Sequence, residues 1–148
     1  MKKILIIFLF LVSSCGFEPL YSSKNSNNFT FEKVETEGEK KINRRIISAI
    51  SIKENTQDYS YKKLILINEK NIIETSRNSK GQPDSFKMAI KLKIILVDKK
   101  NNLTEKDFYE EFSYKNQENK FDLSEYEIKL EDDLIDKIIE DLIIYLNI

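Results

Sequence analysis

Histidine is absent from the 148-residue sequence, and cysteine occurs once, at position 15. A single cysteine excludes an intramolecular disulfide, so an oxidising compartment adds no covalent cross-link to this fold. Without histidine, the chain lacks the ligand sets of common zinc sites and the usual nucleophile–base pairs. Three glycines leave no glycine-rich phosphate loop. We therefore expect no enzyme, no metal site and no cofactor.

Charged residues are abundant but balanced in sign, with 24 Lys and Arg against 25 Asp and Glu and a formal net charge of −1. Nucleic-acid-binding proteins usually carry a clear basic excess. We therefore expect no nucleic acid among the partners. The length fits one domain with a single core, which buries roughly two-thirds of the surface that its unfolded chain exposes.

The first fifteen residues have the layout of an export leader. Two lysines supply positive charge, residues 4–12 form an unbroken apolar run, and two serines precede Cys15. The run is too short to cross a bilayer, which needs about 20 residues. Small residues directly before a cysteine are typical of bacterial lipoproteins, so we expect cleavage before Cys15 and a lipid anchor on it. Stable anchoring takes more than one acyl chain, which a lipoprotein cysteine carries.

The alternative is a secreted protein whose Cys15 is cut away with the leader or left as a spare thiol. Ser22 to Asn28 is polar and reads as a flexible tether. The expected organisation is therefore a signal peptide at 1–14, a lipidated N-terminus and tether at 15–28, and one domain at 29–148.

Residues 15–21 read Cys-Gly-Phe-Glu-Pro-Leu-Tyr. They resemble the mature start of the lipopolysaccharide (LPS)-assembly lipoprotein family, LptE, and especially its alphaproteobacterial branch, where the segment reads Cys-Gly-Phe-x-Pro-Leu-Tyr. A short turn at Ser76 and Arg77 and the order of elements given below resemble that family too. The resemblance implies an outer-membrane lipoprotein that faces the periplasm and the barrel lumen. It implies a partner and plug of the LPS-translocating β-barrel LptD, which assists LPS assembly by binding and not by chemistry.

The first half of the domain predicts a strand, a helix and a second strand. Apolar residues alternate from Phe29, and Thr36-Glu37-Gly38-Glu39 matches a capping box, so a helix should begin at Thr36 and stop near Asn55. A β-branched apolar run over 59–69 predicts the second strand, which residues 71–76 continue past a bulge.

The second half predicts two strands and a long helix. After a turn at 78–84, residues 86–97 alternate apolar and polar side chains, which is typical of a strand with one buried face. A polar turn at 98–102 leads to a strand with Phe108, Phe112 and Tyr114 on one side, and Glu110 within that row predicts a bulge or an exposed strand end.

Ser124-Glu125-Tyr126-Glu127 is a second capping box, with Leu123 and Ile128 placed as a hydrophobic staple, and apolar residues recur at helical spacing from Leu130 to Leu146. The order β-α-β-β-β-α predicts an α/β (α+β) fold. We expect a two-layer sandwich with two helices on one face of a four-stranded mixed sheet. The resemblance to LptE implies the same order.

Two groups of basic residues are candidates for LPS binding. Lys87, Lys91 and Lys93 lie on one face of the strand whose other face is core, and their ammonium groups suit phosphates while their methylene stems suit acyl chains. The alternative is a solvated sheet face on which lysines resist edge pairing. Arg77 matches by position an arginine that the family associates with LPS, and an ordinary surface arginine is the alternative.

Other charged residues are interpreted as helix surface. Arg45, beside Arg44, is expected to face solvent, as are Asp132 and Asp133. The family's second basic position, before the last helix, is occupied here by acidic residues, with only Lys120 nearby. Two rival functions remain: a structural outer-membrane lipoprotein without LPS contact, such as a pilotin or a barrel-assembly accessory, and a hydrolase.

Overall fold

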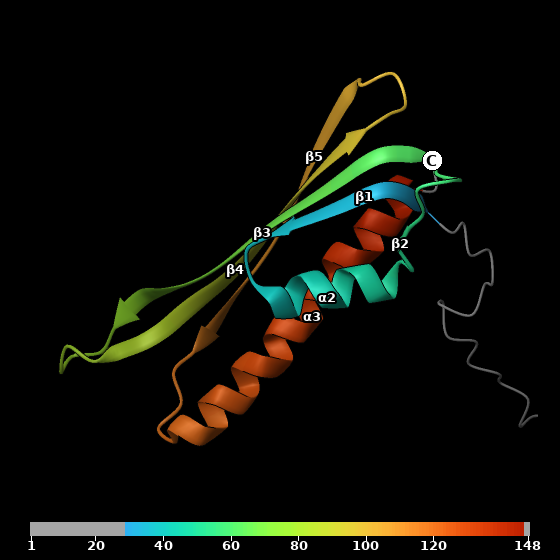
Figure 1. Cartoon of the computed structure of the whole chain (residues 1–148). Helices are drawn as coiled ribbons and strands as arrows, with labels where there is room; N and C mark the ends of the chain where they lie inside the picture. Colours follow the sequence, from blue (N-terminus) through green and yellow to red (C-terminus); the bar gives the residue numbers. More distant parts are fainter. Residues whose placement is uncertain (1–28, 147–148) are drawn as a thin grey trace, which may run out of the picture.

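The computed structural model describes residues 29–146 of the chain. The leader, Cys15 and the tether lie outside these residues. In chain order the elements are β1 (Thr30–Glu37), α2 (Lys40–Ala49), β2 (Lys53–Glu54), β3 (Tyr61–Arg77), β4 (Pro83–Val97), β5 (Leu103–Lys115) and α3 (Lys120–Leu146) (Figure 1).

The strands form one sheet in the order β2-β1-β3-β4-β5. β1 runs parallel to β3, whereas β3, β4 and β5 are antiparallel neighbours. A mixed sheet was predicted correctly, but the prediction of four strands is wrong because Lys53–Glu54 forms a fifth. β2 pairs with β1 through two residues only. Both residues are charged and exposed, so no apolar alternation marks this strand in the sequence.

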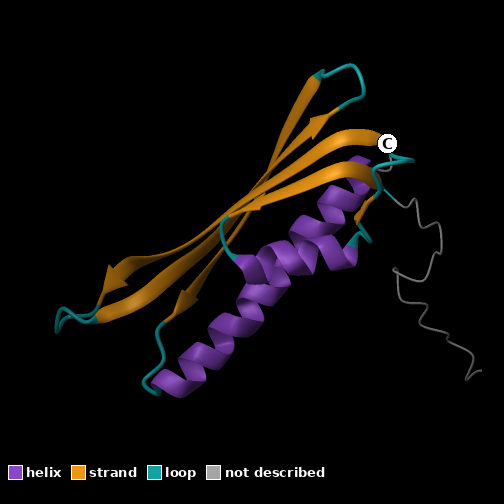
Figure 2. Cartoon of the chain, viewed as in Figure 1, coloured by secondary structure: helices purple, strands orange, loops and turns teal. Residues whose placement is uncertain are grey.

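Both helices pack on one face of the sheet, which gives the predicted two-layer arrangement (Figure 2). Successive side chains of a strand point to opposite faces, so β4 sends every second side chain to the helices. The strand predicted over 86–97 is confirmed, and its apolar row is core. The largest fully buried side chains are Phe31, Ile42, Ile46, Leu66, Met88, Ile90, Leu92, Ile94, Leu134, Ile135, Ile138 and Leu142.

No helix covers the opposite face of the sheet within residues 29–146 (Figure 1). We call this surface the open face. Along β4 it carries Lys87, Ala89, Lys91 and Lys93, the residues that alternate with the core row.

β3 and β4 form a long hairpin that extends beyond the end of β1 (Figure 1). β3 runs through residues 71–76, as predicted, but its register shifts lie later, on either side of Ser76. The turn between the strands is confirmed, because the N–H of Asn78 donates to the carbonyl of Gln82 at 2.9 Å. Gly81 has a φ of +78° there, a conformation that favours glycine.

The start of α2 differs from the predicted capping box. Thr36 lies in β1, and α2 begins after Glu39, which makes no side-chain cap. Asn68 of β3 replaces the cap: its Oδ1 accepts the N–H of Glu39 at 3.0 Å, and its Nδ2 donates to the carbonyls of Glu37 and Glu39. Gly38 has a φ of +92°, and a Cβ there would lie 2.0 Å from the Asn68 carbonyl oxygen. The turn therefore depends on a residue from another strand.

The end of α2 also differs from the prediction. The helix ends at Ala49, and Ser51 adopts a φ of +51°, which stops the helix before Asn55. The side chain of Asn55 instead accepts the N–H groups of Gln57 and Asp58 in the following loop.

α3 begins one turn earlier than predicted. Its first amides are satisfied by Asn119, whose Oδ1 accepts the N–H of Phe121 at 2.9 Å, so Ser124 lies inside the helix and caps nothing. Ile128 is exposed and does not complete a staple. The bulge or exposed strand end predicted at Glu110 is wrong too, because β4 and β5 keep one register along their whole length and Glu110 lies inside β5, half-buried.

Candidate functional site

The three candidate lysines lie on the open face, and they lie on a central strand. β4 is flanked by β3 and β5, so Lys87, Lys91 and Lys93 do not protect a sheet edge. The part of the alternative interpretation that assigned them to edge protection is therefore wrong. Their position on one face, opposite the core row, is as predicted.

Each of these lysines has a carboxylate partner on β5. Nζ of Lys87 lies 3.0 Å from Glu111, and Nζ of Lys93 lies 2.7 Å from Glu105. Nζ of Lys91 lies 4.0 Å from Asp107. The candidate basic row is therefore matched by an acidic row on the neighbouring strand.

The ion pairs change the pKa values of two of these lysines. The hydrogen bond to Glu111 raises the pKa of Lys87, and the hydrogen bond to Glu105 raises the pKa of Lys93. The pKa of Glu111 is lowered, first by the hydrogen bond from the hydroxyl of Tyr109 and then by Lys87. Both lysines stay charged near neutral pH, but a phosphate that binds them must compete with these carboxylates.

Arg77 is held at the far end of the β3–β4 hairpin. Its guanidinium forms an ion pair with Glu74, in which Nη2 lies 3.1 Å from Oε2, and Nη1 donates to the carbonyl of Gly81 at 3.3 Å. Glu74 pairs directly with Phe86, so it lies on the face that carries the helices. The structure therefore brings the three lysines together but does not place the Arg77 guanidinium in their row.

A second cluster of charges, which the sequence analysis did not identify, lies between the two layers. Glu131 of α3 is buried, and its carboxylate accepts from Nζ of Lys41 on α2 and Nζ of Lys70 on β3, both at 2.8 Å. The sequence does carry a signal for it: Glu131 lies four and seven residues before Ile135 and Ile138, on the apolar stripe of α3.

Arg45 belongs to the same layer of charges. It forms ion pairs with Asp132 and Asp136 of α3. Arg45 and Asp132 lie at the surface and are partly exposed, but they are paired with each other, which was not predicted. Burial raises the pKa of Glu131, but the hydrogen bonds from Lys41 and Lys70 outweigh it, and the net shift is downward. This cluster links both helices to the sheet and has the character of a structural contact.

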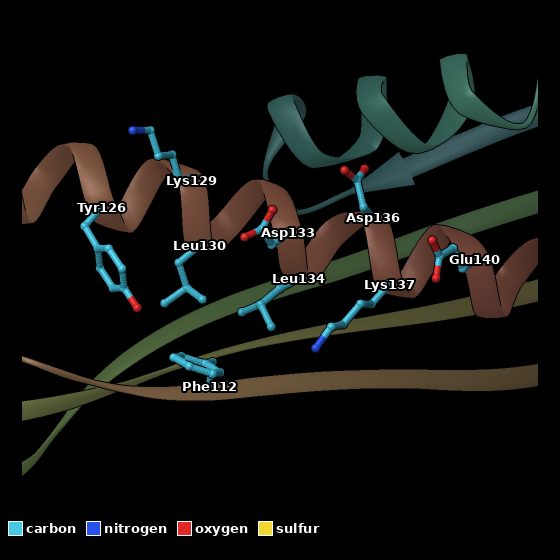
Figure 3. A pocket seen from close by; sticks show the side chains of 9 residues that line it. All are labelled: Phe112, Tyr126, Lys129, Leu130, Asp133, Leu134, Asp136, Lys137 and Glu140. Carbon is cyan, nitrogen blue, oxygen red and sulfur yellow. The ribbon is translucent and has the colours of Figure 1, made fainter. Parts of the chain in front are cut away.

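A groove of about 600 Å³ runs between α3 and β5, and we call it the α3–β5 groove. In Figure 3, Tyr126, Leu130 and Leu134 point from α3 toward Phe112 on β5. Phe112 is 44% exposed, because α3 does not cover it. The remaining lining residues are charged: Lys129, Asp133, Asp136, Lys137 and Glu140. The groove is apolar at its floor and charged at its rim.

Within residues 29–146, no group of three or more acidic side chains is arranged to hold a metal ion. No helix in the same part of the chain is long and apolar enough to span a membrane. Cys15 lies outside the described residues, and its lipidation stays a prediction.

Comparisons with known proteins identify similar folds. No protein-family model matches the chain, and no curated protein matches it. Among solved structures, rare lipoprotein B from Shewanella oneidensis has 11% identity and a TM-score of 0.52, over 74% of this chain and 92% of its own. A minor lipoprotein from Acinetobacter baumannii has 11% identity and a TM-score of 0.53, over 77% and 87%.

A third similar structure is uncharacterized lipoprotein B from Nitrosomonas europaea, with 11% identity and a TM-score of 0.56, over 76% of this chain and 78% of its own. At this identity the three structures show the fold, which covers most of each chain. The domain thus has the two-layer α/β fold of these bacterial lipoproteins.

Proposed function

We propose that this protein is an outer-membrane lipoprotein of the LptE type, a partner of an LptD-like β-barrel that assists LPS assembly. The observation that carries the proposal is the shared fold with three lipoproteins over about three quarters of the chain. The lipoprotein pattern at Cys15 and the resemblance of residues 15–21 support it independently, because they come from the sequence and not from the fold.

The proposed mode of action is binding. The lipid on Cys15 holds the domain at the inner surface of the outer membrane, and the two-layer domain occupies the barrel as partner and plug. LPS phosphates meet Arg77 at the hairpin end and the lysines of the open face. The Arg77 side chain is 65% exposed, which makes it the most accessible of these cations.

A structural lipoprotein without LPS contact, such as a pilotin or a barrel-assembly accessory, is the second candidate. It is favoured by one observation: every candidate cation already has a carboxylate within 4.0 Å. Such a surface is electrostatically satisfied without any ligand, and exposed ion pairs of this kind contribute little to stability.

Crosslinking of the full-length protein in its native membrane, followed by identification of the partner, separates the two candidates. The proposal expects the LPS-translocating barrel as the main adduct, and depletion of the protein should reduce LPS at the cell surface. Adducts with a different barrel and unchanged surface LPS would support the structural candidate and overturn the proposal.

A further inference from the structure

β5 is an open edge of the sheet. It ends the strand order, with β4 as its one hydrogen-bonded neighbour, and ten of its thirteen residues are exposed. At the opposite edge, the start of β1 is covered by β2. The N–H of Asn55 donates to the carbonyl of Phe31. Oε1 of Glu54 accepts the N–H of Val34 at 2.6 Å. Within residues 29–146 the start of β1 is covered, whereas all thirteen residues of β5 are available on their outer side.

The open edge borders the α3–β5 groove. A strand added beside β5 would point alternate side chains toward α3, where Phe112 and Tyr126 are 44% and 37% exposed. Charged residues on an edge strand are an ordinary protection against aggregation. That protection explains the acidic residues of β5 but not the exposed aromatic side chains beside them.

A second copy of this chain would bring like charges together at the centre of the edge. In an antiparallel pair of two β5 strands, each register centred on residues 107 to 111 opposes two carboxylates. Glu110 opposes itself in one register, Asp107 opposes Glu111 in another, and Glu105 opposes Glu111 in a third. Like charges directly opposite each other destabilise a strand pair. Residues 105 to 111 carry four carboxylates and one lysine, so this part of the edge favours a partner of the other sign.

The two faces of β5 define that partner. Glu105, Asp107 and Glu111 lie on the open face, and Phe108 and Phe112 lie on the helix side. The lysines of β4 engage one oxygen of each carboxylate, Oε2 of Glu105 and Glu111 and Oδ1 of Asp107. The other oxygen of each can accept a second cation.

We propose that β5, together with the α3–β5 groove, docks an extended strand of another protein in which basic and apolar residues alternate. The backbone of that strand continues the sheet beyond β5. Its apolar side chains enter the groove beside Phe112, and its basic side chains face Glu105, Asp107 and Glu111. Main-chain pairing supplies the affinity and the alternation supplies the specificity. This inference stands on the sheet edge and the groove beside it and does not depend on a role in LPS assembly.

The test titrates the full-length protein in detergent with a synthetic nine-residue peptide that alternates lysine and valine. Saturable binding is expected, with slower hydrogen exchange in residues 103–115 and unchanged exchange in β1. A peptide that alternates glutamate and valine should bind at least tenfold more weakly. A lysine–valine peptide methylated at every backbone nitrogen cannot complete the ladder in either strand direction and should lose binding.

A pair of variants tests the groove. Phe112→Ser should weaken binding of the lysine–valine peptide about tenfold, whereas Ile144→Ser, at a residue of α3 that is 60% exposed and outside the groove, should not. Melting curves of both variants check the fold, and the N-methylated peptide tests the edge if Phe112→Ser does not fold. Absence of binding, equal binding of the basic and acidic peptides, or protection outside β5 and α3 would overturn the proposal.

Discussion

Oε2 of Glu131 lies 2.8 Å from Nζ of Lys70, so a buried carboxylate of the last helix is tied to a strand sixty-one residues earlier. The Glu131 side chain is 8% exposed and that of Lys70 is 22% exposed. Lys41 of α2 bonds the other oxygen of the same carboxylate. One side chain thus links α2, α3 and β3 at the interface between the two layers.

The first prediction tests this link. Glu131→Gln keeps the shape of the side chain but removes the charge that both lysines need. Breaking a buried pair typically costs 3–5 kcal/mol, and because Lys41 is half exposed we expect a loss of about 2 kcal/mol in the free energy of unfolding. Denaturant melts measure it, with Glu125→Gln, at an exposed position of the same helix, as the control. A loss below about 0.5 kcal/mol would show that the cluster is not structural.

The second prediction concerns the stability of the protein at acidic pH. The pKa of Glu131 is lowered from its ordinary value of 4.5 in the folded protein. The unfolded chain therefore binds this proton more readily, and the stability that Glu131 contributes is present above pH 4.5 and lost as the pH falls below it. Between pH 5 and pH 3 the wild type should lose more stability than Glu131→Gln does. Parallel pH curves for the two proteins would contradict this.

The third prediction concerns the core. Ile138 is 1% exposed between the layers, so Ile138→Asp would bury an unpaired carboxylate, which costs several kcal/mol against a total stability of about 5–15 kcal/mol. Loss of cooperative thermal unfolding is expected. Ile144→Asp, at a residue of the same helix that is 60% exposed, should melt close to wild type. If the first variant also melts within a few degrees, α3 is not packed as described.

The fourth prediction tests LPS contact. The double variant Arg77→Glu and Lys91→Glu should weaken LPS binding, and wild-type binding should fall as salt rises, since exposed charges are screened within about 10 Å at 0.1 M. The melting curve should change little, because both residues form exposed ion pairs.

The matched control for that variant is Lys40→Glu with Lys53→Glu, two exposed lysines away from the candidate surface. It makes the same change in net charge. Equal LPS binding by wild type and the Arg77 and Lys91 variant, with both still associated with the barrel, would leave this protein as a structural plug. If both double variants weaken LPS binding equally, the loss of binding comes from the change in net charge and not from the candidate surface.

The fifth prediction concerns the anchor. Two small residues and an apolar run precede Cys15, so Cys15→Ser should leave an uncleaved precursor or a product released from the membrane. Mass spectrometry of the wild type should find a chain that begins at a lipid-modified Cys15. A chain that begins elsewhere, or an unmodified thiol, would contradict the lipoprotein interpretation. Because Gly16 follows the cysteine, membrane fractionation should place the protein in the outer membrane.

The elements that sequence reasoning predicts well are those whose signal is local. The alternation from Phe86 to Val97 determines both the strand and its buried face, because a two-residue period has no helical equivalent. The start of α2 could not be predicted in this way, because its amide is capped by Asn68 from another strand. Thr36 and Glu39 match a capping box in the sequence, but Thr36 lies in β1 and the side chain of Glu39 makes no cap.

The candidate site, too, could be predicted only in part from the sequence. The alternation predicted that Lys87, Lys91 and Lys93 share a face, but not that each meets a carboxylate. That depends on the register between β4 and β5, in which the acidic residues lie on a separate strand. Register is set by the turn and by the whole hydrophobic pattern, not by any single residue. Whether the charges of a surface are paired thus depends on the tertiary structure, even where each strand can be predicted.

The mixed directions of the sheet have a consequence for the order of folding. β3, β4 and β5 are joined by short turns, so their pairing is local and loop closure is fast. The parallel pairing of Phe31 with Tyr61 must close a segment that contains α2 and β2 first. We expect the β3–β4–β5 meander to form early and β1 to join last, so substitutions in β4 should slow refolding while substitutions in β1 should mainly speed unfolding.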